Sequence, residues 1–141
     1  MTALAQNTEI LCKNVTKHRR FLMAASTTIY KGALCMINAN GLLTNATPTA
    51  STQFAGIAAE GVVSAASGSY YCNVLRDGSH LLTTASMAQA NVGDLMYAAD
   101  SGTVGATATN AHKVGIIDEF VSATQVWVDI SEAVLNPVLG A

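Results

Sequence analysis

The side chains that could carry out acid–base or metal chemistry are few and scattered along this sequence. The three histidines, His18, His80 and His112, are widely spaced, and no H-E-x-x-H motif or local cysteine–histidine cluster has the spacing of a zinc site. Ser, His and Asp residues from distant segments can converge in a fold, but the chain has no G-x-S-x-G nucleophile elbow. We therefore expect no enzymatic activity, no metal site and no cofactor.

Two glutamates occupy matching places in a repeated motif. Glu60 and Glu119 each close a Gly-Ile-x-x-Glu segment. Two carboxyl groups can act as general acid and general base when they meet in a cleft. Because the two copies hold the same place in a repeat, we favour a structural role, in which each glutamate caps a backbone turn or faces solvent.

The cysteines and the first residues bear on the compartment of the protein. Cys12, Cys35 and Cys72 are odd in number, widely spaced and without a C-x-x-C pair, which predicts buried free thiols rather than disulfides. The N-terminal segment lacks the basic-then-apolar arrangement of a secretory signal, so we expect the chain to be made and kept in a reducing compartment.

One segment concentrates positive charge. Four of the seven Lys and Arg residues lie together with one histidine, as Lys13, Lys17, His18, Arg19 and Arg20. We interpret this cluster as part of an N-terminal arm, residues 1–29, that binds an acidic partner surface, where Arg can pair with carboxylates in bidentate fashion. A solvated turn before the first strand is the simpler alternative. Nucleic acid is disfavoured because no aromatic residues are interleaved with the cations.

The composition is unusually poor in charge. Charged residues make up 11% of the 141 residues and apolar residues 50%, against about a quarter charged in ordinary soluble domains. Such a surface suits a protein whose outer faces are covered by partners. The net charge of −2 gives no reason to expect nucleic acid, and no apolar run is long enough to span a membrane.

An internal duplication organises most of the chain. The segment "GALCMINANGLLT" is echoed by "GDLMYAADSGTVG", and each is followed by a Gly-Ile-x-x-Glu segment and then by a β-prone stretch, "YYCNVL" or "QVWVDI". We expect a single β domain, residues 30–133, with repeats at about 30–78 and 91–133, followed by a C-terminal tail, 134–141. Because no helix start follows them, the repeated glycines are interpreted as structural turns rather than a phosphate cradle, at Gly32, Gly41, Gly56, Gly93, Gly102 and Gly115.

These patterns predict an all-β fold, a small β-sandwich or barrel that is β-tulip-like. Each echoed segment reads as a hairpin, and Asp77-Gly78 predicts another between "CNVLR" and "SHLLT". Alternation in "QVWVDI" places Val126, Val128 and Ile130 on one face. One short helix is expected near 84–91, where Ala, Met and Gln follow a Thr or Ser N-cap.

The order of these segments resembles that of the small capsid decoration, or cement, proteins of tailed bacteriophages. The likeness extends from about Tyr30 to Ile130 and is carried by the Lys31-Gly32 pair, the stretch from Gly93 to Tyr97 with the turn that follows it, and the two Gly-Ile-x-x-Glu segments. The resemblance implies a β-rich protein that binds the outside of an expanded capsid and stabilises it. It further implies the major capsid protein as partner, a homotrimer on the capsid, synthesis in the host bacterial cytoplasm and a final place on the virion surface.

Two other classes remain open from the residues. Other virion structural parts, such as a tail-tube, head-to-tail connector or fibre-base protein, are also small, β-rich and poor in charge. A small β-barrel enzyme or ligand-binding module would instead require a pocket in which polar groups converge.

Overall fold

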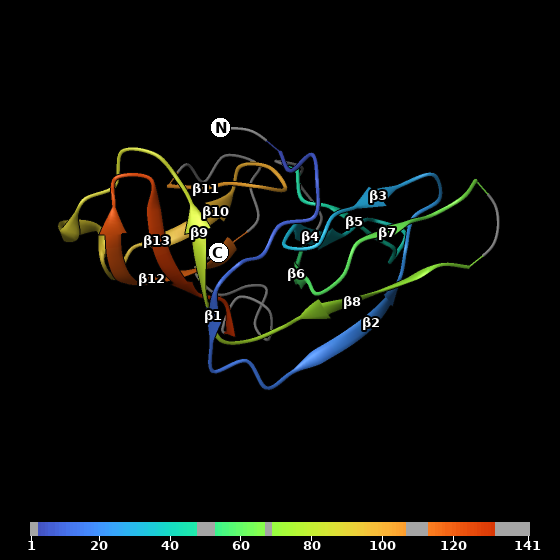
Figure 1. Ribbon diagram of the computed structural model, residues 1–141, viewed down its shortest axis with the longest axis horizontal. Coiled ribbons are helices and arrows are strands. Elements are labelled where there is room, and N and C mark those ends of the chain that lie inside the picture. Colours follow the sequence, from blue (N-terminus) through green and yellow to red (C-terminus); the bar gives the residue numbers. More distant parts are fainter. Residues whose placement is uncertain (1–2, 48–52, 67–68, 107–112, 132–141) are drawn as a thin grey trace.

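Short apolar runs closed by glycine, asparagine and aspartate turns give this chain an almost entirely β architecture. The computed structural model describes residues 3–47, 53–66, 69–106 and 113–131 (Figure 1). The described strands are β1 (Cys12–Lys13), β2 (His18–Leu22), β3 (Thr28–Ile29), β4 (Leu34–Ile37), β5 (Leu43–Asn45), β6 (Gln53–Ala58), β7 (Val62–Val63), β8 (Tyr71–Leu75), β9 (Ser79–Thr83), β10 (Leu95–Ala98), β11 (Val104–Gly105), β12 (Lys113–Ser122) and β13 (Gln125–Asp129).

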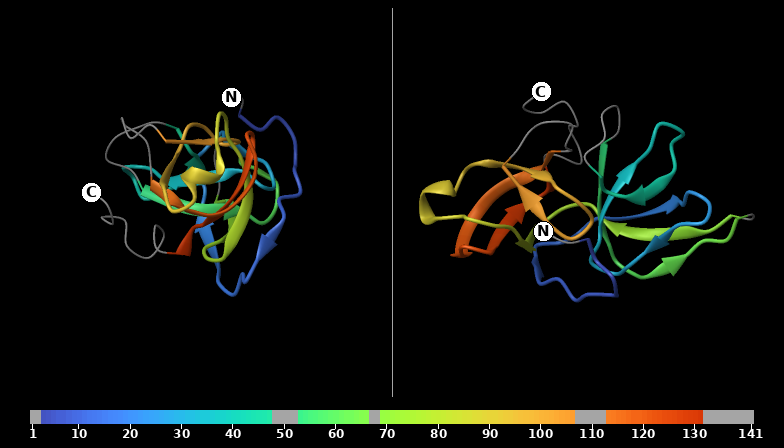
Figure 2. Two further views of the ribbon diagram at one scale, coloured as in Figure 1. Left: turned by 90° about the vertical axis from the view of Figure 1, so that its left-hand side faces the viewer. Right: turned by 90° about the horizontal axis from the view of Figure 1, so that it is seen from above.

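The strands form two large sheets and one small one. One sheet has the order β2-β8-β6-β4-β5, the other β1-β9-β13-β12-β10-β11, and β3 pairs with β7. The two large sheets lie toward opposite ends of the long axis (Figure 1), and the view from above shows the same division (Figure 2, right). The sheets pack as a small β-sandwich, which confirms the predicted all-β fold.

The two large sheets share one strand arrangement. Without β1, each sheet contains five strands in matching order, so that β2, β8, β6, β4 and β5 correspond to β9, β13, β12, β10 and β11. Even the irregularities match, because the register shifts just after Cys35↔Gly56 in one unit and just after Met96↔Gly115 in the other. The duplication therefore includes the strand pair β2 and β9, and each unit begins before the predicted repeat starts at about 30 and 91.

The glycines of the repeat have two different structural roles. Gly32, Gly41 and Gly93 have positive φ at turns, whereas Gly56 and Gly115 lie inside strands, at the matching bulges. A Cβ on Gly56 would stand 2.3 Å from the Leu75 carbonyl oxygen, and one on Gly115 would stand 2.0 Å from that of Asp129. Because these two glycines have no side chain, the neighbouring backbones can approach closely. The prediction that Gly56 and Gly115 are turn residues is therefore wrong. Gly102 lies in a turn in which its N–H donates to Asp100 Oδ1 at 2.8 Å.

A shared core makes the two units one body. One cluster of buried side chains joins Leu34, Phe54 and Ile57 of the first unit to a larger set from the second. A second cluster lies within the first unit and includes Cys35, Cys72 and Val74. Val126, Val128 and Ile130 are fully buried, as their alternation predicts.

The Asp77-Gly78 hairpin prediction is wrong. β8 pairs with β2 and β6, while β9 pairs with β13 and β1, so the segment between them crosses from one large sheet to the other. The turn signal itself is real, since Gly78 has φ of 85°. Asp-Gly sequences specify a reversal of the chain but leave open which strands then pair.

The helix predicted near 84–91 is also wrong, since only a 3-10 turn, η1 (Gln89–Asn91), forms there. Ser86 has a positive φ of 57°, which interrupts any helix. The N–H groups of Thr84 and Met87 donate to the carbonyls of Thr124 and Ala123 in the β12–β13 turn, at 2.9 and 3.1 Å. Tertiary hydrogen bonds thus override the helix propensity of this segment.

The described part of the predicted arm, residues 3–29, is not separate from the β domain. Within them, β1 pairs with β9, β2 with β8 and β3 with β7. The basic cluster is therefore divided between the two large sheets, with Lys13 on β1, His18 to Arg20 on β2, and Lys17 just before β2. The predicted C-terminal tail, 134–141, lies outside the described residues.

Candidate partner-binding surface

β2 places most of the predicted partner-binding residues along one margin of the molecule. It is the terminal strand of its sheet and lies along the lower margin in Figure 1, with β8 on one side. His18, Arg19 and Arg20 pair with Leu75, Val74 and Asn73 of β8 and are exposed to solvent. The strand is thus rigidly held along one side while its cations face outward.

Asp77 fixes the start of this strand. Its Oδ1 accepts the N–H groups of Thr16 and Lys17 at 2.8 and 3.0 Å, and its Oδ2 accepts the Thr16 hydroxyl at 2.5 Å. Burial alone would raise the pKa of Asp77, but these hydrogen bonds and the Lys17 charge lower it below its ordinary value. The carboxylate therefore stays ionised and holds the basic segment in register.

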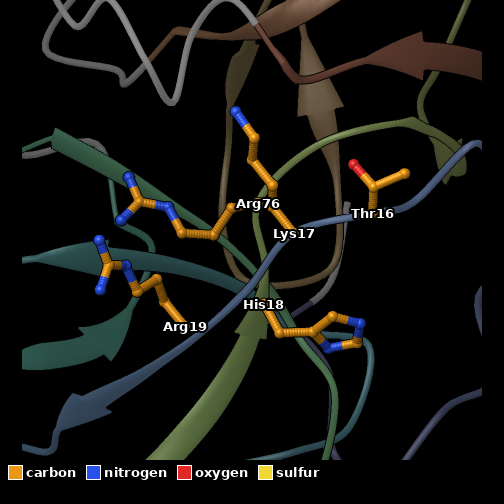
Figure 3. A pocket seen from close by; sticks show the side chains of 5 residues that line it. All are labelled: Thr16, Lys17, His18, Arg19 and Arg76. Carbon is orange, nitrogen blue, oxygen red and sulfur yellow. The ribbon is translucent and has the colours of Figure 1, made fainter.

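Arg76, the residue after β8, lies next to the basic segment. Its N–H donates to the Lys17 carbonyl at 3.0 Å, and with Thr16, Lys17, His18 and Arg19 it lines a hollow of about 450 Å³. In Figure 3 the Arg19 and Arg76 side chains extend to the same side of the strand, while His18 points the other way. We call Lys17, His18, Arg19, Arg20 and Arg76 the basic edge.

Two cations of the basic edge, Arg20 and Arg76, lie against aromatic rings. The Arg20 guanidinium is 4.3 Å from the centre of the Tyr71 ring, and that of Arg76 is 5.1 Å from the centre of the Phe21 ring. Burial, followed by the charge of Arg19, lowers the pKa of Arg76 from its ordinary value. Stacking on these rings orients the two planar guanidinium groups.

Lys13 does not belong to this surface. It lies on β1, where its ammonium is 4.1 Å from the centre of the Trp127 ring and 3.7 Å from Glu119 Oε1. The structure therefore separates Lys13 from the other four predicted residues and gives it a place on the second sheet.

Glu60 and Glu119 have separate structural contacts. Glu60 Oε2 accepts both the N–H and the side-chain amide of Asn73 at 2.9 Å, while Glu119 pairs with Lys13. Glu60 thus binds backbone as expected of a capping side chain. Neither carboxylate is among the residues that line the hollow at the basic edge.

The three cysteines and His80 differ in how far they are buried. Cys35 and Cys72 are buried, as predicted, whereas Cys12 is exposed on β1, which corrects the expectation for that residue. His80 is fully buried, and its Nε2–H donates to the Asp77 carbonyl at 2.9 Å, while its Nδ1 has no hydrogen-bond partner among the described residues. Burial lowers the pKa of His80, against the opposing effect of this hydrogen bond.

Across the described ranges, no three His, Cys, Asp or Glu side chains gather so that they could hold a metal ion. No helix in this part of the chain is long and apolar enough to cross a membrane. Comparisons with protein-family models, curated proteins and solved structures gave no match. The likeness to decoration proteins accordingly depends on the sequence motifs alone.

Two contributors to this surface were missed by sequence reasoning, Arg76 and Asp77. Both stand in "VLRDG", next to the turn signal, but their link to residues 16–19 depends on the pairing of β2 with β8. The sequence offered one clue, which is that Arg76 is isolated. Outside the predicted cluster the chain has only two other Lys or Arg residues, Lys31 and Lys113.

Proposed function

We propose that this chain is a decoration protein, which binds the outer surface of an assembled, expanded phage capsid and stabilises it. Its partners are then the major capsid protein and, in a homotrimer on the capsid, its own copies. The chain is made in the cytoplasm of the bacterial host and ends on the outer surface of the virion. The role is structural and involves no catalysis.

The observation that carries this proposal is the gathering of cations along one edge of a charge-poor molecule. The basic edge holds four of the seven Lys and Arg residues, Lys17, Arg19, Arg20 and Arg76, while only 11% of the chain is charged. A free protein normally relies on surface charge for solubility, so a neutral body suits permanent contact with neighbours. A basic edge favours an acidic partner surface.

The motifs that resemble decoration proteins are also those that build the duplicated body. The two Gly-Ile-x-x-Glu segments contain Gly56 and Gly115, which allow the matching close approaches between strands. A rigid body with a shared core supports the proposed role, because a clamp that bends freely would transmit little stabilisation to the shell.

The proposed mechanism is thermodynamic linkage. A protein that binds the expanded shell more tightly than any looser or unexpanded form shifts the equilibrium toward the expanded shell. Many equivalent copies act together on one particle, so that a modest affinity at each site is enough. The stabilisation should therefore depend on occupancy and on the free concentration of the protein.

The first test is fractionation of particles from the virus or cell that encodes the chain, with copy number measured by mass spectrometry against the major shell protein. The proposal expects abundance close to that of the shell protein on DNA-filled heads. Absence from heads, or only a few copies per particle, would contradict it. Presence in tails would instead favour the tail-tube, connector or fibre-base class.

A further inference from the structure

No strand of the described chain pairs with the outer side of β2, whereas the matching strand of the second unit is paired on both sides. Among the described residues β2 pairs with β8 alone, whereas β9 pairs with β13 on one side and with β1 on the other. The correspondence between β2 and β9 is fixed by flanking hydrogen bonds. Met23 N–H donates to Tyr70 O as Thr84 N–H donates to Thr124 O, at 2.8 and 2.9 Å.

This correspondence matches Arg20 with Leu81. Arg20 lies opposite Asn73 on β8, and Leu81 lies opposite Trp127 on β13. In the second unit the Leu81 N–H donates to the Leu11 carbonyl at 2.9 Å, next to β1. The chain thus already contains one example of a segment added at this place in the plan.

The peptide group of Arg20 faces the open side. On β8, the Asn73 N–H donates to Glu60 at 2.9 Å, and its carbonyl accepts the Ala59 N–H at 2.9 Å, so neither group is directed at β2. Arg20 and Asn73 therefore form a non-hydrogen-bonded pair of an antiparallel ladder. The N–H and C=O of Arg20 point outward, and alternation gives the same direction to those of His18.

The cations determine which segment fits this edge. A second copy of β2 would bring its own cations against them, which like-charge repulsion opposes. Figure 3 shows His18 on one side of the strand and Arg19 with Arg76 on the other. Because side chains alternate between the two faces of a strand, Arg20 lies on the same side as His18. Carboxylates on a docked strand would find a cation on either face.

We propose that the outer edge of β2 binds an extended, acidic segment of a partner protein, which adds to the sheet as an antiparallel strand. Its backbone bonds to Arg20 and His18, and its carboxylates pair with the basic edge. On the proposed function this partner is the major capsid protein, so the identity of the partner rests on that function. The docking site itself rests on the pairing and the charge.

The test uses the purified full chain, labelled with ¹⁵N, and a synthetic peptide of alternating glutamate and threonine as the probe. We expect saturable shifts of the Arg20 and His18 amide signals and slower hydrogen exchange at the Arg20 amide. A lysine–threonine peptide of equal length is the charge control. Binding of both peptides alike, or shifts that avoid β2, would overturn the proposal.

Backbone addition is separated from simple charge attraction by two N-methylated versions of the glutamate peptide. Methyl groups on one set of alternate amides block the bonds to β2, while those on the other set face solvent. The version methylated on the amides that face β2 should lose binding, and the version methylated on the solvent-facing amides should keep it. Equal binding of both would show that the cations attract acids without forming a strand, which contradicts the docking mode.

Charge variants complete the test. The double variant Arg19→Glu with Arg20→Glu should lower the affinity for the glutamate–threonine peptide by at least about tenfold. Lys113→Glu, a single charge reversal on β12 of the second unit, is the control for position and should leave binding unchanged. An unchanged affinity in the double variant with native amide spectra would overturn the role of the cations.

The failures of the two proposals can be told apart. If the chain is abundant on heads but the probe does not reach β2, decoration stands and strand addition at this edge is wrong. If the probe binds β2 but the chain is absent from particles, the docking edge stands and the capsid role is wrong.

Discussion

Arg20 and Leu81 occupy the same place in the two units, yet only the N–H of Leu81 donates to another segment of the described chain. The Leu81 N–H bonds the Leu11 carbonyl at 2.9 Å, while Arg20 presents its peptide group at the open side of β2. An internal duplication normally repeats its contacts. Here one copy is closed by the chain itself, and the other carries cations at its open edge.

The bulge glycines are the first point at which the duplicated plan can be tested. Gly115→Ala should lower the free energy of unfolding by about 1 to 3 kcal/mol or more, since its Cβ would stand 2.0 Å from the Asp129 carbonyl oxygen. Gly56→Ala should behave alike, because its Cβ would stand 2.3 Å from the Leu75 carbonyl oxygen. Urea denaturation of the purified variants measures both.

Gly41→Asn is the control for these two variants. Nothing lies within 4 Å of a Cβ at Gly41, and asparagine tolerates the positive φ of 77° found there. Its stability should stay close to that of the parent protein. If Gly56→Ala and Gly115→Ala were equally mild, the close approach of neighbouring strands would not be a constraint on this fold.

Local patterns predicted the strands well because the hairpins are local. The pairs β4–β5 and β10–β11 form around the turns expected from their sequence, and the buried face of β13 follows its alternation. The strand β2 was missed because "HRRFL" carries charges where an alternating strand would show apolar residues. Its structure comes from β8, which is distant in the sequence.

The same distinction applies to the candidate surface. The cations at 17–20 are visible in the sequence, but their exposure on an open edge depends on long-range pairing. Asp77 was interpreted only as part of a turn, although its carboxylate also anchors Thr16 and Lys17. Helix propensity near Ser86 was overridden by hydrogen bonds to the β12–β13 turn, which no local window contains.

Asp77 should stabilise the protein through its three hydrogen bonds. Asp77→Ala leaves the N–H groups of Thr16 and Lys17 and the Thr16 hydroxyl without this acceptor. We expect a loss of about 2 to 3 kcal/mol of unfolding free energy, measured by urea denaturation at neutral pH. Because the pKa of Asp77 is lower in the folded state than its ordinary 3.8, its contribution is present above that pH and is lost below it.

The variant should therefore differ from the parent most at neutral pH and least in strong acid. Thr16→Val removes one of the three bonds and should have a smaller effect in the same direction. A loss of stability for Asp77→Ala that did not shrink as the pH fell below about 3.8 would point to packing rather than to the ionised carboxylate.

The three thiols should differ in reactivity. Cys12 is exposed, so iodoacetamide should label it in the native protein. Burial and then the nearby Glu60 raise the pKa of Cys72 to about 11, and burial raises that of Cys35 still further. Mass spectrometry should show one adduct in native buffer and all three in denaturant. Labelling of Cys35 or Cys72 as fast as Cys12 would contradict the assigned core.

His80 should make the protein less stable as the solution becomes mildly acidic. Burial lowers the pKa of His80 below its ordinary 6.5, so the unfolded chain binds a proton in a range where the folded chain does not. Stability is therefore complete above about pH 6.5 and falls as the pH drops through that value toward the folded pKa. Unfolding free energies measured between neutral pH and pH 5 should show this decline.

A His80→Gln variant separates this titration from other effects of acid. Glutamine can donate to the Asp77 carbonyl as the imidazole Nε2–H does, but it does not titrate. The variant will be less stable at neutral pH because the packing of a fully buried ring is lost. Its stability should nevertheless change less than that of the parent between pH 6.5 and pH 5. An equally steep decline in both proteins would assign the acid sensitivity to groups other than His80.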